Sequence, residues 1–136
     1  MYSKGVHHLG VAVADLDVAL DTYRRLFAAT LEHRALVVEQ GVEAASVMVG
    51  GSRIELLAPT GEDTPVGRFL ARRGEGMHHV AYEVADVGET LDALAGLGVE
   101  LIDLQPRRGL FGLQVAFVHP DAVHGVLTEV VSVGSE

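Results

Sequence analysis

The stretch Gly74–Val87, GEGMHHVAYEVADV, is the strongest indication of the fold, because a second stretch repeats its pattern. Near the N-terminus, Gly5–Leu16 reads GVHHLGVAVADL. Placing His8 over His79 aligns the strand, the Ala-Asp turn and the start of a helix without a gap, at an offset of 71 residues. This offset, just over half the chain, indicates two copies of one module, each with a histidine at the start of its first strand.

The composition is that of an ordinary folded protein. Of the 136 residues, 49% are hydrophobic and 21% are charged, which is enough for one core. The absence of cysteine excludes disulfides and thiolate metal sites and is compatible with the cytoplasm. A formal net charge of -9 argues against nucleic acid as a partner, and the N-terminal region contains no apolar run typical of a signal peptide or membrane span.

Periodicity predicts the same order of elements in both modules. In module one, about residues 5–59, a helix capped by Asp15 or Asp17 follows the first of four strands at 6–13, 31–38, 42–49 and 53–57. In module two, about residues 76–133, a helix at 87–97 follows the first of four strands at 78–84, 99–104, 113–118 and 126–131. Thr64 and Pro65 begin a linking helix that runs to about Arg73. The predicted class is α+β, with residues 1–136 forming a single domain.

Strand alternation separates the two histidines of each repeat. His8 and His79 share their faces with glycine and alanine, which leaves room for a ligand. Their neighbours, His7 and His78, lie on the opposite faces and are interpreted as structural residues. If the modules pair about a pseudo-twofold axis, His8 and His79 line one cavity.

A carboxylate stands in the last strand of each module. Glu55 lies in RIELL, 47 residues after His8, and Glu129 lies in VLTEVV, 50 residues after His79. A carboxylate in a buried strand is costly unless it is paired or bound to metal, whereas one on an edge strand can lie in water. Taken singly, a histidine at the start of a strand is more often an ordinary hydrogen-bonded residue, and each glutamate is at least equally compatible with an edge strand in water. Jointly, two imidazoles and two carboxylates suit Co²⁺, Ni²⁺, Mn²⁺ or Zn²⁺.

These residues resemble the vicinal oxygen chelate superfamily, which includes glyoxalases, bleomycin resistance proteins and dioxygenases. Within it the chain is most similar to the methylmalonyl-CoA epimerases, on segments that include TPVGRFL, GMHHVAY and GVLTEVV. The resemblance implies two paired βαβββ modules that form a cup-shaped mixed sheet around a divalent metal, with Co²⁺ as the first choice. It also implies four metal ligands: His8, Glu55, His79 and Glu129.

The implied reaction interconverts the 2R and 2S forms of methylmalonyl-CoA by removal of the α-proton, with a metal-stabilised thioester enolate. Inversion needs acid/base groups on both sides of the α-carbon. Glu129 matches one of them, but Ala44 stands where the resemblance implies the second glutamate. Glu43 is adjacent and is the second catalytic candidate if a bulge after Gly41 turns it inward. Otherwise water or another group delivers the second proton, or the activity differs.

An acyl-CoA carries phosphates, so an acidic chain needs local cations to bind it. Arg107 and Arg108, in PRRGLFG, are the candidate substrate-binding residues, and Arg68, Arg72 and Arg73 form a second basic cluster. Both clusters are equally compatible with a role in solubility. The resemblance also implies a homodimer.

Three other functions of this superfamily were weighed. A glyoxalase I-type lactoylglutathione lyase uses the same four ligand positions, but HPDAVHGVLTE before the last strand is closer to the epimerase form. A ring-cleaving dioxygenase needs two histidines and one carboxylate with open positions, which Glu55 as a fourth ligand argues against. A metal-free binding protein of this fold typically loses the ligands, whereas all four are present.

Overall fold

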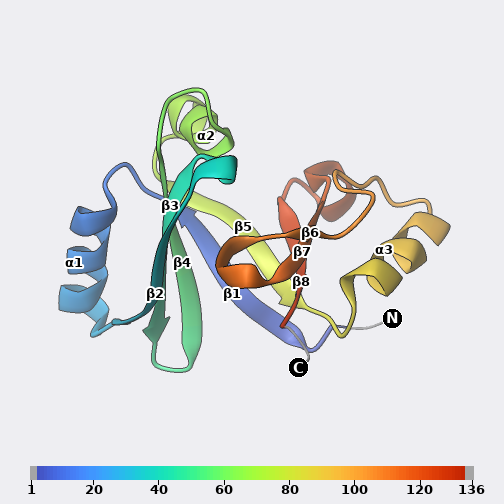
Figure 1. Cartoon of the computed structure of the whole chain (residues 1–136), viewed down its shortest axis with the longest axis horizontal. Coiled ribbons are helices and arrows are strands. Elements are labelled where there is room, and N and C mark those ends of the chain that lie inside the picture. Colours follow the sequence, from blue (N-terminus) through green and yellow to red (C-terminus); the bar gives the residue numbers. More distant parts are fainter. Residues whose placement is uncertain (1–2, 134–136) are drawn as a thin grey trace. The chain divides into compact units, whose positions relative to one another are not determined.

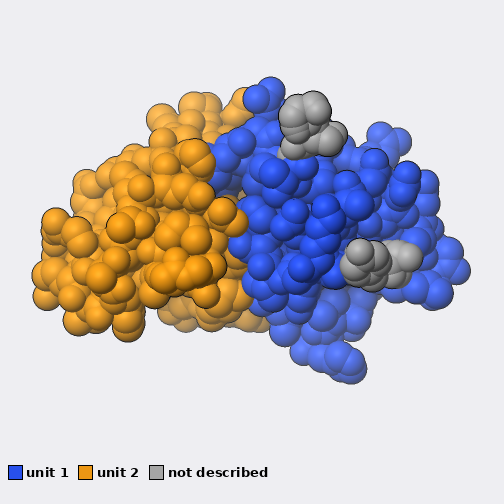
Figure 2. All heavy atoms as spheres, turned by 90° about the horizontal axis from the view of Figure 1, so that it is seen from below, with its two compact units in different colours: residues 1–7, 79–136 blue, residues 8–78 orange. Residues whose placement is uncertain are grey.

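The computed structural model describes residues 3–133. The chain divides into two compact units, residues 8–78 and residues 1–7 with 79–136, coloured orange and blue in Figure 2. No helix in the described range has the length and apolar character needed to cross a membrane. The assignment of the whole chain to a single domain stays a prediction.

Strands and helices follow the βαβββ order twice, with one helix between the two runs (Figure 1). The first run contains β1 (Gly5–Ala12), α1 (Leu16–Phe27), β2 (Thr30–Val37), β3 (Val42–Val49) and β4 (Ser52–Pro59). Helix α2 (Pro65–Arg73) follows it. The second run contains β5 (Gly76–Glu83), α3 (Val87–Gly96), β6 (Arg107–Arg108), β7 (Gln114–Val118) and β8 (Thr128–Ser132). The repeated βαβββ order predicted from the two histidine stretches is confirmed.

In the unit of residues 8–78, the strands are hydrogen-bonded in the order β2-β3-β4-β1. Strand β3 is antiparallel to both neighbours, whereas β1 and β4 are parallel. Helix α1 begins after Asp15, whose carboxylate accepts the backbone N–H of Val18 at 3.0 Å. The helix packs on one face of the sheet, in a core that includes Leu16, Ala45 and Leu56. Apolar side chains fill this face, so candidate metal ligands can lie only on the opposite face of the sheet.

Helix α2 has the predicted bounds. The hydroxyl of Thr64 accepts the backbone N–H of Gly67 at 3.0 Å, and Pro65 occupies the first turn. A Cβ atom at Gly67 would come within 2.3 Å of the carbonyl oxygen of Gly61. The first turn of α2 therefore requires glycine at this position.

In the unit that contains residues 79–133, the strands are hydrogen-bonded in the order β5-β8-β7-β6. Strands β5 and β8 are parallel, and the other two pairs are antiparallel. Helix α3 begins after Asp86, whose carboxylate accepts the backbone N–H of Glu89 at 2.9 Å. Leu91 on α3 packs with Val84 and Val130 in the core of this unit. The parallel β5–β8 pair thus repeats the β1–β4 pair of the other unit.

One predicted strand is wrong. Residues 99–104 form no strand and have only a single bridge, between Leu101 and Val118. Leu104 is 78% exposed, so alternation of apolar side chains did not reflect burial here. The second strand of the second run is instead the two-residue β6, within the segment 106–112 that was expected to be a loop.

Candidate metal centre

The parallel neighbours β1 and β4 bring His8 and Glu55 together. Glu55 is the register partner of Gly10, two residues beyond His8, so the two side chains lie on the same face. His8 Nε2 lies 3.4 Å from Glu55 Oε2, and both side chains are almost fully buried. An imidazole and a carboxylate that are 47 positions apart in the sequence thus form a buried pair on the face opposite to α1.

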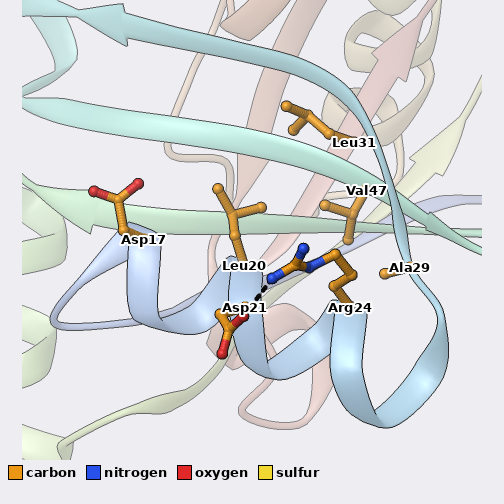
Figure 3. A pocket seen from close by; sticks show the side chains of 7 residues that line it. All are labelled: Asp17, Leu20, Asp21, Arg24, Ala29, Leu31 and Val47. Atoms are coloured by element: carbon orange, nitrogen blue, oxygen red, sulfur yellow. Dashed lines mark hydrogen bonds and ion pairs between the residues drawn. The ribbon is translucent and has the colours of Figure 1, made fainter.

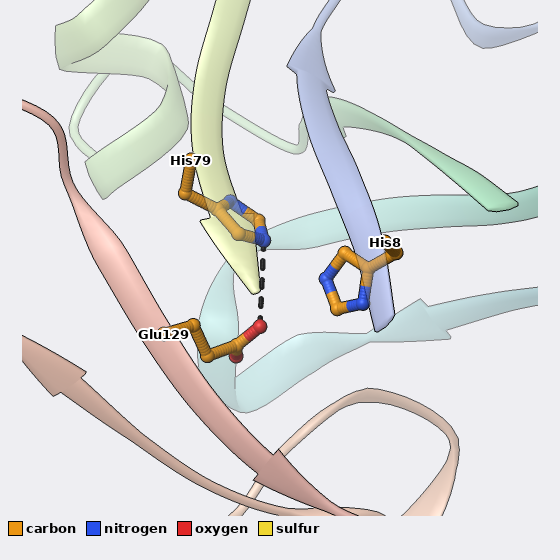
Figure 4. A group of neighbouring side chains, drawn as sticks. All are labelled: His8, His79 and Glu129. Atoms are coloured by element: carbon orange, nitrogen blue, oxygen red, sulfur yellow. Dashed lines mark ion pairs between the residues drawn. The ribbon is translucent and has the colours of Figure 1, made fainter. Parts of the chain in front are cut away.

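Strands β5 and β8 bring His79 and Glu129 together in the same way. Glu129 is the register partner of Ala81, two residues beyond His79. His79 Nε2 lies 3.4 Å from Glu129 Oε1, as Figure 4 shows, and both side chains are buried. In both units the glutamate lies opposite the residue two positions after the histidine, and the two form a buried pair. The sequence repeat indicates this equivalence of the two modules.

The donor atoms of each pair suit a divalent ion. Metal–nitrogen and metal–oxygen bonds to zinc-like ions are about 2.0 to 2.2 Å long, so two ligands of one ion lie about 3.0 to 3.5 Å apart. The observed separation of 3.4 Å agrees with that range. In each unit the pair offers one imidazole donor and one carboxylate donor. Nitrogen and oxygen ligands of this kind bind first-row transition metals, so the residues fit such an ion.

The site residues stand among small side chains, as the sequence predicted. Gly10 and Ala12 follow His8 on the same face of β1, and Ala81 follows His79 on β5. All three are buried. On β1 and β5, the residues that directly follow the two imidazoles on these faces are therefore small.

His78 is a structural residue. Its ring meets that of Phe69 on α2 edge-on, with the ring centroids 4.9 Å apart. His78 is half-buried, whereas His79 is 4% exposed. The adjacent histidines therefore face different surroundings, as strand alternation requires.

The expectation that a bulge turns Glu43 inward is wrong. The register between β3 and β4 is continuous from Val42 to Val49, with Glu43 opposite Ala58 and Ser46 opposite Glu55. Opposed residues share a face, so Glu43 lies on the face that packs against α1. Its carboxylate accepts from Arg34 Nε at 3.1 Å. Ala44, which is fully buried, occupies the face of Glu55 instead.

A polar cluster next to Glu55 was not predicted. Between Leu31 and His33 the register of β2 shifts, and Glu32 falls at this irregularity. The Glu32 carboxylate accepts from Ser46 Oγ at 2.6 Å and from Arg53 Nε at 2.8 Å. The hydrogen bond from Arg53 is the largest cause, and that from Ser46 the next, of a pKa of Glu32 lowered to about 2. A register shift has no clear sequence signal, so this cluster was not found from the sequence.

The two predicted substrate-binding arginines lie on β6, and both are exposed. Arg107 Nε donates to Asp103 Oδ2 at 3.2 Å, and its guanidinium lies 5.4 Å from the ring centroid of Phe117. Arg107 is therefore engaged within its own unit. The sequence did not single out Phe117, although its position two residues before His119-Pro120 places it on the last buried part of β7.

A pocket of about 210 Å³ lies between α1 and the strands β2 and β3 (Figure 3). Leu20, Ala29 and Val47 line it with apolar atoms, and Asp21 and Arg24 form an ion pair at its edge. None of the predicted ligands lines this pocket. It lies on the α1 side of the sheet and does not belong to the candidate metal centre.

Residues 7–117 match the model of the glyoxalase/bleomycin resistance protein/dioxygenase superfamily. A Dictyostelium discoideum protein named methylmalonyl-CoA epimerase, mitochondrial, is 34% identical over 91% of this chain and 75% of its own length. The crystal structure of methylmalonyl-CoA epimerase from Mycobacterium tuberculosis is similar with a TM-score of 0.93 and 35% identity, covering 98% of this chain and 90% of that one. The Streptomyces coelicolor methylmalonyl-CoA epimerase, in complex with 2-nitronate-propionyl-CoA, is similar with a TM-score of 0.93 and 37% identity, covering 98% and 97%. The predicted fold class is confirmed by this likeness.

Proposed function

Because this chain belongs to the glyoxalase/bleomycin resistance protein/dioxygenase superfamily, we propose that it is a metal-dependent epimerase that interconverts the 2R and 2S forms of methylmalonyl-CoA. The observation that carries the proposal is the buried histidine–glutamate pair that each unit builds from the same strand register. The similarity to epimerases, one of them bound to a substrate-like acyl-CoA, supports the choice of reaction.

His8, Glu55, His79 and Glu129 are proposed to hold one divalent ion, with Co²⁺ the first candidate and Mn²⁺, Ni²⁺ or Zn²⁺ the others. Two imidazoles and two carboxylates give a donor set for these ions with no sulfur ligand. A bound ion of this kind acts as a Lewis acid that makes the proton α to a thioester more acidic. Burial of both pairs supports this role, because each carboxylate is removed from water.

Glu129 is proposed to handle the α-proton. Its carboxylate is buried beside His79 and stands at the position of the proton-handling glutamate that the resemblance implies. Inversion also needs a proton on the opposite side of the α-carbon. Glu43 lies on the α1 face and does not supply it, so water or another group delivers this second proton.

Arg107 and Arg108 are proposed to contribute the positive charge that an acyl-CoA requires in a chain of net charge -9. Both arginines are exposed on β6, and Arg107 also donates to Asp103 within its own unit. The protein is further proposed to be a cytoplasmic homodimer. A glyoxalase I-type lyase is the alternative function, since it would use the same four ligands.

The decisive experiment incubates the protein with methylmalonyl-CoA in D₂O before and after metal removal. We expect deuterium at the α-carbon with metal present and its loss after chelation, with recovery on addition of Co²⁺. No deuterium uptake by the metal-loaded protein would overturn the epimerase proposal. Exchange that chelation leaves unchanged would overturn the metal-dependent mechanism, and turnover of a glutathione hemithioacetal in place of methylmalonyl-CoA would favour the alternative.

A further inference from the structure

Phe117 on β7 lies against both His79 and Arg107. Its ring meets the His79 imidazole edge-on, with ring centroids 5.7 Å apart and ring planes at 85°. The Arg107 guanidinium lies 5.4 Å from its ring centroid. Phe117 is also the register partner of Glu129, so the two side chains share a face. One aromatic ring thus contacts the histidine of the pair and neighbours its carboxylate.

Asp103 fixes both groups that meet at this ring. Its Oδ2 atom accepts the backbone N–H of Phe117 at 2.8 Å and Nε of Arg107 at 3.2 Å. The Phe117 carbonyl accepts the backbone N–H groups of Ile102 and Asp103 at 3.0 and 3.1 Å. The Asp103 side chain is 19% exposed, so its hydrogen bonds are partly protected from water. The segment 102–107 is held on β7 by these contacts although it forms no long strand.

We propose that Phe117 is a positioning residue for His79, and that Asp103 and Arg107 hold its ring in place. An imidazole that binds an ion through one nitrogen must keep its ring orientation, and groups around a ligand commonly fix that orientation. An edge-to-face aromatic contact favours one ring orientation over others. The role in metal binding rests on the proposed function, whereas the orienting contact exists without a metal.

Of the two adjacent arginines on β6, only Arg107 contacts the Phe117 ring in this arrangement. Arg107 is tied to Asp103 and the Phe117 ring, so it acts on His79 through Phe117. Arg108, the next residue on β6, has no part in this arrangement around Phe117. A cation over an aromatic face contributes modestly at an exposed position, so Arg107 is expected to have a smaller effect than the ring itself.

The chain contains a matched control for this arrangement. Phe69 meets His78 edge-on at 4.9 Å, and the Arg73 guanidinium lies 5.7 Å from the Phe69 ring centroid. The same three residue types therefore surround the adjacent histidine, which is not a proposed ligand. Phe69→Leu removes an aromatic contact of the same kind from His78, which is not a proposed metal ligand.

The test compares Phe117→Leu, Phe69→Leu and Arg107→Gln by NMR of the histidine side chains in metal-free protein, followed by Co²⁺ titration. We expect Phe117→Leu to shift the His79 imidazole resonances, leave those of His78 in place and weaken Co²⁺ binding about twofold to tenfold. Phe69→Leu shifts His78 and leaves His79 and Co²⁺ affinity unchanged. Arg107→Gln shifts the His79 resonances in the same direction by a smaller amount.

His79 resonances that stay in place in Phe117→Leu, or that shift equally in Phe69→Leu, would overturn the positioning role. Because Arg107 is exposed, Arg107→Gln tests the same contact if Phe117→Leu fails to fold. Unchanged His79 resonances in Arg107→Gln would then overturn it. The NMR comparison needs no metal, so a wild-type protein that binds no Co²⁺ contradicts the proposed function without deciding this inference.

Discussion

The guanidinium of Arg34 lies 3.1 Å from the carboxylate of Glu43, on the sheet face that packs against α1. Arg34 also donates to Asp17 of α1 at 2.7 Å. Glu43 therefore belongs to a surface ion-pair group and not to the face of Glu55. This geometry argues against the sequence alternative in which Glu43 replaces the glutamate missing at Ala44.

Glu43→Gln is consequently expected to leave catalysis almost unchanged. We expect kcat and KM for methylmalonyl-CoA within about twofold of the wild-type values, because surface ion pairs contribute little. The measurement is the initial rate of epimerisation, with Glu62→Gln as an exposed control. A loss of kcat of a hundredfold or more would show that Glu43 reaches the substrate.

Glu129→Gln and Glu55→Gln are expected to differ. Both replacements keep the shape of the side chain, but only Glu129 is assigned a proton-handling role. We expect Glu129→Gln to lower kcat by about 10² to 10⁴, the range for general acid–base catalysis, and Glu55→Gln to lower it by less than tenfold. Metal content measured on both variants separates loss of the base from loss of the ion. Equal losses of kcat at equal metal content would contradict the assignment.

The adjacent histidines provide a test of the metal ligands. His79→Asn is expected to lower bound Co²⁺ or Zn²⁺ strongly, because it removes a buried imidazole donor beside Glu129. His78→Asn removes a side chain that contacts Phe69 and is expected to leave metal content unchanged. Metal analysis after dialysis measures both. Similar metal content in the two variants would exclude His79 as a ligand.

Arg108→Ala is expected to raise KM for methylmalonyl-CoA about fivefold with little change in kcat, since it removes an exposed charge that attracts the substrate phosphates. The effect should shrink as salt is added, because exposed charges are screened. The rates are measured across a range of NaCl concentrations, with Arg68→Ala as the control from the other basic cluster. A change in kcat alone would argue against substrate contact.

The lowered pKa of Glu32 leads us to expect that the stability of the folded protein depends on pH in a specific window. Its pKa in the folded protein is lowered to about 2 from an ordinary value of 4.5, by hydrogen bonds from Arg53 and then Ser46. A lowered pKa in the folded state stabilises the protein above pH 4.5, and this contribution is lost as the pH falls from 4.5 towards 2. We expect about 1 kcal/mol after solvent screening is allowed for. Thermal unfolding of Glu32→Gln should therefore be less sensitive to pH than that of the wild type in this window, and an identical dependence would contradict the assignment.

The sequence predicted the parts of the site that the repeat carries twice. The two histidines and two glutamates occupy equivalent places in the two modules, so symmetry identified residues that singly would look ordinary. Helix starts were also predicted, because Thr64 caps α2 as expected and Asp15, one of two candidates, caps α1.

The rest depends on contacts that no local pattern records. The segment 99–104 has the composition of a strand, but Asp103 bonds to the backbone of Phe117 and only Leu101 forms a bridge. Glu32 reaches Ser46 at an irregularity in the pairing of two strands. Both features depend on which strand lies beside which, and that is fixed by tertiary packing.

Parallel pairing of β1 with β4 and of β5 with β8 has a consequence for biosynthesis. Each histidine meets its glutamate only after 47 or 50 further residues have been added, unlike a chelating motif on one helical turn. A growing chain on the ribosome therefore offers no compact chelate, and the second pair is complete only when residue 129 has emerged. Ion capture follows tertiary folding, so a bound ion would report that both strand pairings have formed, and it would slow their loss.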